Sequence, residues 1–133
     1  MPTLSIVIVV YNDKENFRVS IDSIVSLVRR PDEVIVVDNC STDGSSDVVT
    51  DYSSLNAKHI IENDIGIFDA MNKGIDVANG DLITFMNSGD KYLTTDVFDE
   101  IRAACFIPTI YKTHFGKRKH VKVRNIKFSI PYC

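Results

Sequence analysis

The 133-residue chain lacks an apolar run long enough to cross a membrane. Its longest run, Leu4–Val10, has seven residues and includes Ser5, whereas a membrane span needs roughly 20 residues. No basic segment precedes this run, so we expect no secretory signal. The three cysteines, Cys40, Cys105 and Cys133, are odd in number and widely spaced. This pattern favours a reducing cytosol over a disulfide framework or a zinc site.

Acidic residues are absent from residues 101–133, which nevertheless hold 8 of the 15 basic residues. Residues 1–100 hold all 18 acidic residues against 7 basic ones, a net charge of −11. Two interpretations stay open: the basic segment binds an anionic partner such as a membrane surface, or it neutralises the acidic body. We expect no nucleic-acid partner.

Several motifs of nucleotide-binding and hydrolytic enzymes are also missing. No G-x-G-x-x-G follows the first apolar run, and neither the phosphate loop G-x-x-x-x-G-K-[ST] nor G-x-S-x-G occurs. His59, His114 and His120 are too scattered for a histidine metal pair. These absences exclude dinucleotide-binding dehydrogenases, P-loop NTPases and α/β-hydrolases.

Short apolar runs, rich in β-branched residues, predict buried parallel strands over 4–10, 33–37, 58–61 and 81–86. Between them, apolar residues recur with helical spacing. The predicted helix faces carry Phe17, Ile21, Ile24 and Val28, and then Phe68, Met71, Ile75 and Ala78. We therefore expect an α/β fold with a mostly parallel sheet flanked by helices.

Capping and turn residues predict the element ends. Asn12 or Asp13 can cap the first helix, Pro31 ends it, and Gly80 stops the helix around Met71. Further helices are expected at 46–52 and 96–105. We expect a core domain over 1–105 and a basic extension over 106–133 with weak strand character.

Polar residues follow three predicted strands at their carboxyl ends, where open parallel sheets bind ligands. They are Tyr11 and Asn12, then Asp38 and Asn39, and finally Ser88–Asp90. Any one of them alone is typical of a loop residue or a helix cap. Together they predict one crevice.

Four sequence blocks resemble family 2 glycosyltransferases, in the family's order. They are residues 5–12 (SIVIVVYN), 36–45 (VVDNCSTDGS), 62–75 (ENDIGIFDAMNKGI), and 78–83 with 85–90 (ANGDLI, FMNSGD). The residues of these blocks are most similar to those of bacterial enzymes that build O-antigen, capsule or exopolysaccharide. The resemblance implies the Rossmann-like GT-A fold, a nucleotide-sugar donor, often UDP-linked, and Mn2+ or Mg2+.

The resemblance also assigns roles to individual residues. Tyr11 would pack against the base, with Asn12 beside it, and Asp38 with Asn39 would reach the base and ribose. Asn39 stands where many members have a second Asp, and Gly89 replaces an acid that often precedes the position of Asp90. The block over 62–75 adds further donor-binding candidates, which are Asp69, Asn72 and Lys73.

Asp90 would hold the metal, and simple electrostatics supports this role. A carboxylate about 4 Å from a pyrophosphate oxygen is repelled by roughly 4 kcal/mol at an effective dielectric near 20. A cation between them removes the repulsion, and one or two carboxylates plus phosphates suit Mg2+ or Mn2+. Lys73 could assist, although a solvated helix lysine is the simpler interpretation.

Inverting glycosyl transfer, which the resemblance implies, needs a base to deprotonate the acceptor hydroxyl. No acidic residue lies in 101–133, so we expect this base beyond Cys133, together with the acceptor-binding part. The expected reaction transfers a sugar to a glycan or lipid-linked acceptor, as in lipopolysaccharide synthesis. We expect it in the cytoplasm, where the inner membrane face is a candidate site of peripheral association.

Two rival functions stay open for the chain. A non-catalytic nucleotide-sugar-binding module would act through a partner. A nucleotidyltransferase is disfavoured because no Gly-rich phosphate loop follows the first strand. We expect the chain alone to dimerise or aggregate through an unpaired sheet edge.

Overall fold

The computed structural model of the chain describes residues 3–99. Its sheet has four parallel strands in the order β3-β2-β1-β4. The strands are β1 (Leu4–Val10), β2 (Glu33–Asp38), β3 (Lys58–Ile61) and β4 (Leu82–Asn87). The predicted alternation of strands and helices is confirmed. The predicted extension over 106–133 lies outside the described residues. Of the helix predicted at 96–105, only residues 96–99 are described, and 97–99 are helical.

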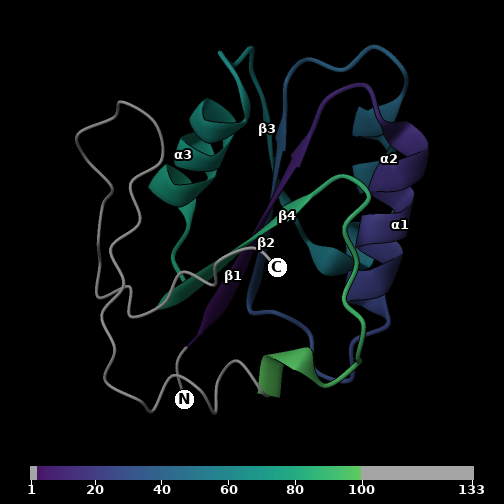
Figure 1. Ribbon diagram of the computed structural model, residues 1–133, viewed down its shortest axis with the longest axis vertical. Coiled ribbons are helices and arrows are strands. Elements are labelled where there is room, and N and C mark those ends of the chain that lie inside the picture. Colours follow the sequence, from purple (N-terminus) through teal and green to yellow (C-terminus); the bar gives the residue numbers. More distant parts are fainter. Residues whose placement is uncertain (1–2, 100–133) are drawn as a thin grey trace.

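Helices cover both faces of this sheet (Figure 1). Helices α1 (Lys14–Val25) and α2 (Ser45–Asp51) lie on one face, and α3 (Ile67–Val77) lies on the other. A short 3-10 turn, η1 (Ser53–Leu55), follows α2. Because β2 and β3 extend the sheet on one side of β1 and β4 on the other, the order reverses between β1 and β4. Open α/β sheets bind ligands outside the carboxyl ends of the strands at such a reversal.

Strand β1 is buried on both faces, which explains its nearly continuous apolar sequence. Alternate side chains belong to two separate cores. Ile6 and Ile8 pack with Phe17 and Ile21 of α1. The intervening residues belong to the α3 core, which comprises Val7, Val9, Ile35, Val37, Ala70, Met71, Ile75 and Ile83. The burial of both faces fixes the register of the central strand.

Helix α3 lies close to β1. A Cβ atom at Gly74 would come within 2.3 Å of a methyl group of Val7. Only glycine therefore permits this distance between helix and strand. The close packing holds the amino-terminal turn of α3 near the carboxyl end of β1.

The prediction of a buried position is wrong for two residues. Val28 is 78% exposed because α1 ends at Val25, and the neighbouring Leu27 is buried instead. Phe68 is 51% exposed because it lies in the first turn of α3, away from that helix's buried positions. Among the helices of residues 3–99, none combines the length and apolar character needed to span a bilayer.

Candidate functional site

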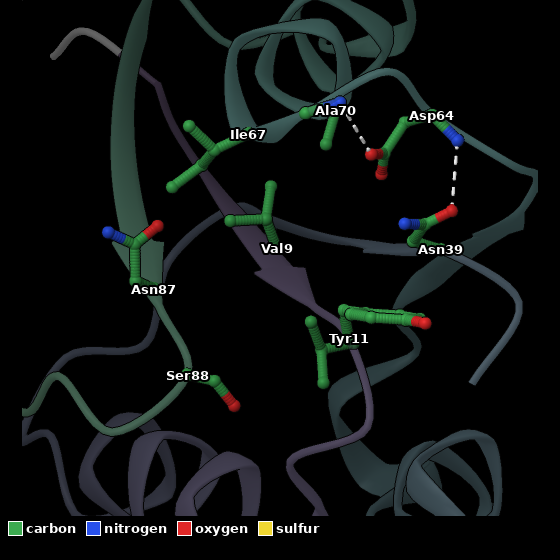
Figure 2. A pocket seen from close by; sticks show the side chains of 10 residues that line it. Val9, Tyr11, Asn39, Asp64, Ile67, Ala70, Asn87 and Ser88 are labelled. Carbon is green, nitrogen blue, oxygen red and sulfur yellow. Dashed lines mark hydrogen bonds between the residues drawn. The ribbon is translucent and has the colours of Figure 1, made fainter. Parts of the chain in front are cut away.

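A pocket of about 380 Å³ lies where the strand order reverses (Figure 2). Its size falls within the range of small-molecule sites, about 300–1,000 Å³. The end of β1, the loop after β2, the loop before α3 and the end of β4 all contribute to it. Its lining consists of Val9, Val10, Tyr11, Asn39, Asp64, Gly66, Ile67, Ala70, Asn87 and Ser88.

Tyr11 follows directly after β1, and its side chain is 61% exposed at the pocket. The buried strand before it fixes its backbone, while its ring faces outward. An exposed aromatic ring beside an apolar wall provides a flat surface on which a planar group can stack. Figure 2 shows the ring below Asn39 and Val9 in the view.

Asn39 and Asp64 lie together on one wall of the pocket (Figure 2). The backbone N–H of Asn39 donates to the carbonyl of Val10, which ties the loop after β2 to β1. The Asn39 Oδ1 atom accepts a hydrogen bond of 2.9 Å from the backbone N–H of Asp64. Asp64 Oδ1 in turn accepts from the backbone N–H of Gly66 at 3.0 Å. Two loops are thereby joined at the site.

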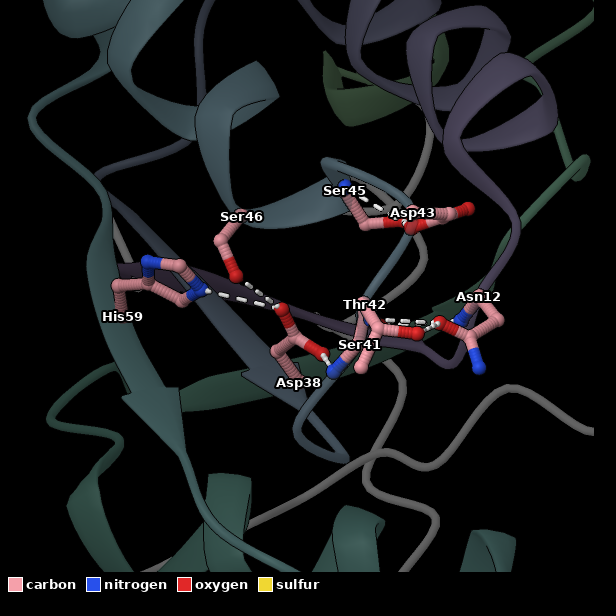
Figure 3. A network of polar contacts seen from close by, with 8 residues as sticks. All are labelled: Asn12, Asp38, Ser41, Thr42, Asp43, Ser45, Ser46 and His59. Carbon is pink, nitrogen blue, oxygen red and sulfur yellow. Dashed lines mark hydrogen bonds and ion pairs between the residues drawn. The ribbon is translucent and has the colours of Figure 1, made fainter.

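Asn12 was predicted to contact the donor, but its side chain joins a network within the protein (Figure 3). Its Oδ1 atom accepts a 2.7 Å hydrogen bond from the backbone N–H of Thr42. Its own backbone N–H donates to Ser41 Oγ at 2.9 Å. Asn12 has a φ of 44°, a left-handed conformation that asparagine tolerates better than most residues. Asn12 therefore connects the ends of β1 and β2.

Asp38 is fully buried, so its carboxylate has no surface available to a ligand in this structure. The carboxylate accepts hydrogen bonds from the backbone N–H of Ser41 at 2.9 Å and from Ser46 Oγ at 2.7 Å. His59 Nε2, from β3, lies 3.8 Å away (Figure 3). The predicted direct contact with base or ribose is therefore wrong here. Asp38 instead positions the loop that carries Asn39.

Asp43 extends the same network towards α1. Its carboxylate accepts from the Ser45 hydroxyl at 2.6 Å and from the backbone N–H of Lys14 at 2.9 Å. Asp43 thus satisfies a free N–H at the start of α1, which Asp13, although in the N-cap position, does not do with its own side chain. Chiefly the hydrogen bond from Ser45, with that from Lys14, lowers the pKa of Asp43 below its usual value.

The three candidates on α3, Asp69, Asn72 and Lys73, do not line the pocket. Asn72 is buried, and Asp69 accepts from the backbone N–H of Ile65. The side chain of Lys73 is only 16% exposed, so the expectation of a solvated lysine is wrong. Its Nζ atom donates to the carbonyl of Asn63 at 2.6 Å and lies within 3.6 Å of Asp69. Lys73 therefore fastens the loop before α3.

Asp90 is exposed on the turn that follows β4. Its Oδ2 atom accepts from the backbone N–H of Asn87 at 2.9 Å. The buried hydroxyl of Ser20 donates to the Asp90 carbonyl at 2.7 Å and accepts from the N–H of Gly89. Helix α1 thus fixes this turn beside the end of the pocket formed by Asn87 and Ser88.

The arrangement of sheet, pocket and exposed carboxylate agrees with the comparison to known proteins. The model of glycosyl transferase family 2 matches residues 5–130. The chain belongs to this family. The resemblance seen in the sequence is therefore confirmed.

Similar proteins show the same family and fold. A Bacillus subtilis protein named as a teichuronic acid biosynthesis glycosyltransferase is 30% identical over 94 residues, which are 68% of this chain and 37% of that protein. A Pyrobaculum calidifontis mannosyltransferase, solved with GDP-Man and Mn2+, superposes with a TM-score of 0.74 and 22% identity over 82% of this chain and 34% of that one. S. aureus TarS 1–349, solved with UDP-GlcNAc, gives a TM-score of 0.70 and 24% identity over 89% and 36%. This family 2 chain thus spans little more than a third of these relatives, and it has the GT-A fold.

The residues of this family 2 chain fit a divalent cation held by one carboxylate. Within residues 3–99, no group of three or more His, Cys, Asp or Glu side chains forms a metal cage. Asp90 uses one oxygen for the Asn87 N–H, and across the described part of the chain no donor contacts its Oδ1 atom. A single free carboxylate oxygen suits Mg2+ or Mn2+ that takes its other ligands from phosphates and water.

Sequence reasoning missed Asp64 as a site residue. The candidates came from the ends of the first, second and fourth strands and, within the block over 62–75, from Asp69, Asn72 and Lys73, so the end of β3 was not included. A signal was present, because the polar residues 62–64 and Gly66 stand between a strand and a helix. That position is also a carboxyl end of the same parallel sheet.

Proposed function

We propose that this chain is the donor-binding part of an inverting glycosyltransferase. The enzyme transfers a sugar from a UDP-linked donor to a glycan or lipid-linked acceptor in bacterial surface polysaccharide synthesis. The observation that carries the proposal is the pocket between the ends of β1 and β4, with Tyr11 on one side and Asp90 beyond Ser88. The pocket offers a stacking surface, and the exposed Asp90 carboxylate lies on the turn that follows its lining residues Asn87 and Ser88.

The dimensions of the sheet suit a nucleoside diphosphate. Neighbouring strands lie about 4.8 Å apart, so the ends of β2 and β4 are separated by about 10 Å. A base that stacks on Tyr11 beside Asn39 would therefore place its diphosphate near Ser88 and Asp90. The apolar residues Val9, Ile67 and Ala70 form the wall behind the base and exclude water from it.

Asp90 would hold Mn2+ or Mg2+ in this proposal. When bound, the cation neutralises the diphosphate that leaves as the sugar is transferred. The protein's own contribution is to fix Asp90 through the Asn87 N–H and the Ser20 hydroxyl. A carboxylate held in place loses little conformational freedom when the ligand binds.

The comparisons support a nucleotide-sugar donor. The two solved proteins with this fold were crystallised with GDP-Man and Mn2+ or with UDP-GlcNAc. The Bacillus subtilis relative is named for the synthesis of a surface polymer, teichuronic acid. A cytoplasmic location is part of this proposal, because three widely spaced cysteines favour a reducing compartment.

Several parts of the proposal concern residues outside the described range. The domain division at residue 105, the membrane contact of the basic segment and dimerisation all involve residues 100–133. The general base is still predicted beyond Cys133. In the site itself, the contacts of Tyr11, Asn39 and Asp90 with the donor are the testable core of the proposal.

Calorimetric titration with UDP, with and without Mn2+, tests the proposed function. We expect Mn2+-dependent binding that Asp90→Asn weakens at least about tenfold, because a charge-assisted contact contributes about 1.5–3 kcal/mol. Asp47→Asn is the matched control, since it removes the same charge from exposed α2. A folded chain that binds no nucleoside diphosphate would refute the proposal. Release of UDP from UDP-GlcNAc by the chain would exclude the non-catalytic module, whereas binding without turnover is expected of both functions.

A further inference from the structure

We propose that Asp64 determines which base the pocket accepts, acting with the amide of Asn39. The pair would select a base whose ring N–H stands next to a carbonyl group, as in uracil and guanine. This inference rests on the proposed function, because it concerns the base end of the same pocket. It assigns Asp64 a role as a specificity-determining residue.

The orientation of the Asn39 amide is fixed by its neighbour. Its Oδ1 atom accepts the 2.9 Å hydrogen bond from the backbone N–H of Asp64. A flipped amide would place its NH2 group against that N–H, and two donors cannot bond to each other. The hydrogen bond therefore keeps Oδ1 towards Asp64 and Nδ2 on the other side. Figure 2 shows the Nδ2 atom on the side towards Val9. Asn39 therefore offers the pocket a hydrogen-bond donor.

Asp64 offers the complementary acceptor. Its Oδ1 atom is already used by the backbone N–H of Gly66 at 3.0 Å, which folds the loop before α3. Within residues 3–99, no donor contacts the other carboxylate oxygen, Oδ2. The residue is partly buried in the pocket lining, beside Asn39. Apart from the Tyr11 phenol, Asp64 is the only ionisable side chain that lines this pocket within the described residues.

A donor next to a carboxylate has a preferred partner among the bases. The carboxylate accepts a ring N–H, such as N3–H of uracil or N1–H of guanine, in a charge-assisted hydrogen bond. The Asn39 amide donates to the adjacent carbonyl. Cytosine and adenine carry an unprotonated ring nitrogen at the same position, and its lone pair repels the carboxylate. The neighbouring Tyr11 ring would stack on the base and keep its ring nitrogen in line with the Asp64 carboxylate.

Pairs of related nucleotides provide the test. UDP and CDP differ at the base positions that the pair would contact, and GDP and ADP form the corresponding purine pair. In calorimetric titrations of the full chain with Mn2+, we expect UDP to bind better than CDP, or GDP better than ADP, by about tenfold or more. In Asp64→Asn, which keeps an Oδ1 acceptor for Gly66, this preference should fall by about tenfold. The Asp47→Asn control should retain it.

Each other outcome overturns the inference. If Asp64→Asn still binds nucleotides with an unchanged preference, Asp64 does not read the base, although the proposed function stands. If the wild-type chain prefers CDP or ADP, the assigned pattern of donor and acceptor is wrong. If the folded wild-type chain binds none of the four nucleotides, the proposed function itself fails, and this inference fails with it.

Discussion

Two regions at the same edge of the sheet use similar polar residues in opposite ways. The loop network (Asn12, Asp38, Ser41, Thr42, Asp43, Ser45 and Ser46) uses its polar groups in hydrogen bonds within the protein (Figure 3). The pocket wall (Tyr11, Asn39 and Asp64) presents an aromatic ring, an amide and a carboxylate to the pocket (Figure 2). The difference cannot lie in residue type, because both regions contain an asparagine and at least one aspartate.

Strand geometry explains the division. Successive side chains of a strand point to opposite faces of the sheet. Val9 and Val37 belong to the core under α3, and the residues two positions later, Tyr11 and Asn39, line the pocket on that side. Val10 and Val36 belong to the core under α1 and α2, and the residues two positions later, Asn12 and Asp38, enter the loop network. The alternation thus continues past the strand ends and separates structural from ligand-facing groups.

The largest expected effect is on stability and comes from Asp38 in the loop network. Asp38→Ala would leave the Ser41 N–H and the Ser46 hydroxyl without their buried acceptor. We expect the free energy of unfolding to fall by about 2–4 kcal/mol, measured by urea denaturation. Asp51→Ala is the control, because this exposed partner of Arg18 should contribute less than about 1 kcal/mol. Equal losses of unfolding free energy in both variants would contradict the structural role of the loop network.

The next effect is on binding alone and comes from Tyr11 in the pocket wall. Tyr11→Ala should weaken UDP binding about tenfold, since stacking on a base contributes about 1–3 kcal/mol. Because the side chain is 61% exposed, stability should change by less than about 0.5 kcal/mol. Tyr11→Phe keeps the ring and should bind UDP almost as well as the wild type. A clear loss of stability in Tyr11→Ala, with unchanged affinity for UDP, would assign Tyr11 to the structural group.

The smallest effect is a pH dependence of the loop network. The pKa of Asp43 is lower in the folded chain, chiefly through the hydrogen bond from Ser45. Asp43 therefore stabilises the fold above its unfolded pKa, near 3.8, and this contribution is lost as the pH falls through the lower folded value. Asp43→Asn should be less stable than the wild type at pH 7, and the difference should shrink on acidification. A difference that is constant with pH would exclude this titration.

Much of the fold followed from local patterns. The alternation of β-branched runs with helical periodicity predicted all four strands and the helices between them. The errors fell where an element ends. Val28 continues the periodicity of α1 but lies beyond its last turn. Phe68 fits the α3 pattern but lies in the first turn of that helix and is half exposed. Periodicity describes an ideal helix, and only the packed neighbours determine how far each helix is covered.

The candidate site followed from the sequence less completely. Tyr11, Asn39 and Ser88 were correctly expected at one crevice. Asp38 was misjudged because burial depends on α2 closing over it, and Lys73 because its partners Glu62 and Asp69 come together only when the loop before α3 folds back. Asp64 was overlooked because its proximity to Asn39 requires β3 to pair with β2.

The sequence by itself determined the family, the order of strands and helices, and the edge of the sheet that carries the site. These properties depend on side-chain periodicity and on four blocks that can be read along the chain. The tertiary structure alone decided which carboxylate is buried, at Asp38, and which faces the pocket, at Asp64. That distinction arises because hydrogen bonds and burial depend on residues distant in sequence, which only the strand order β3-β2-β1-β4 brings together.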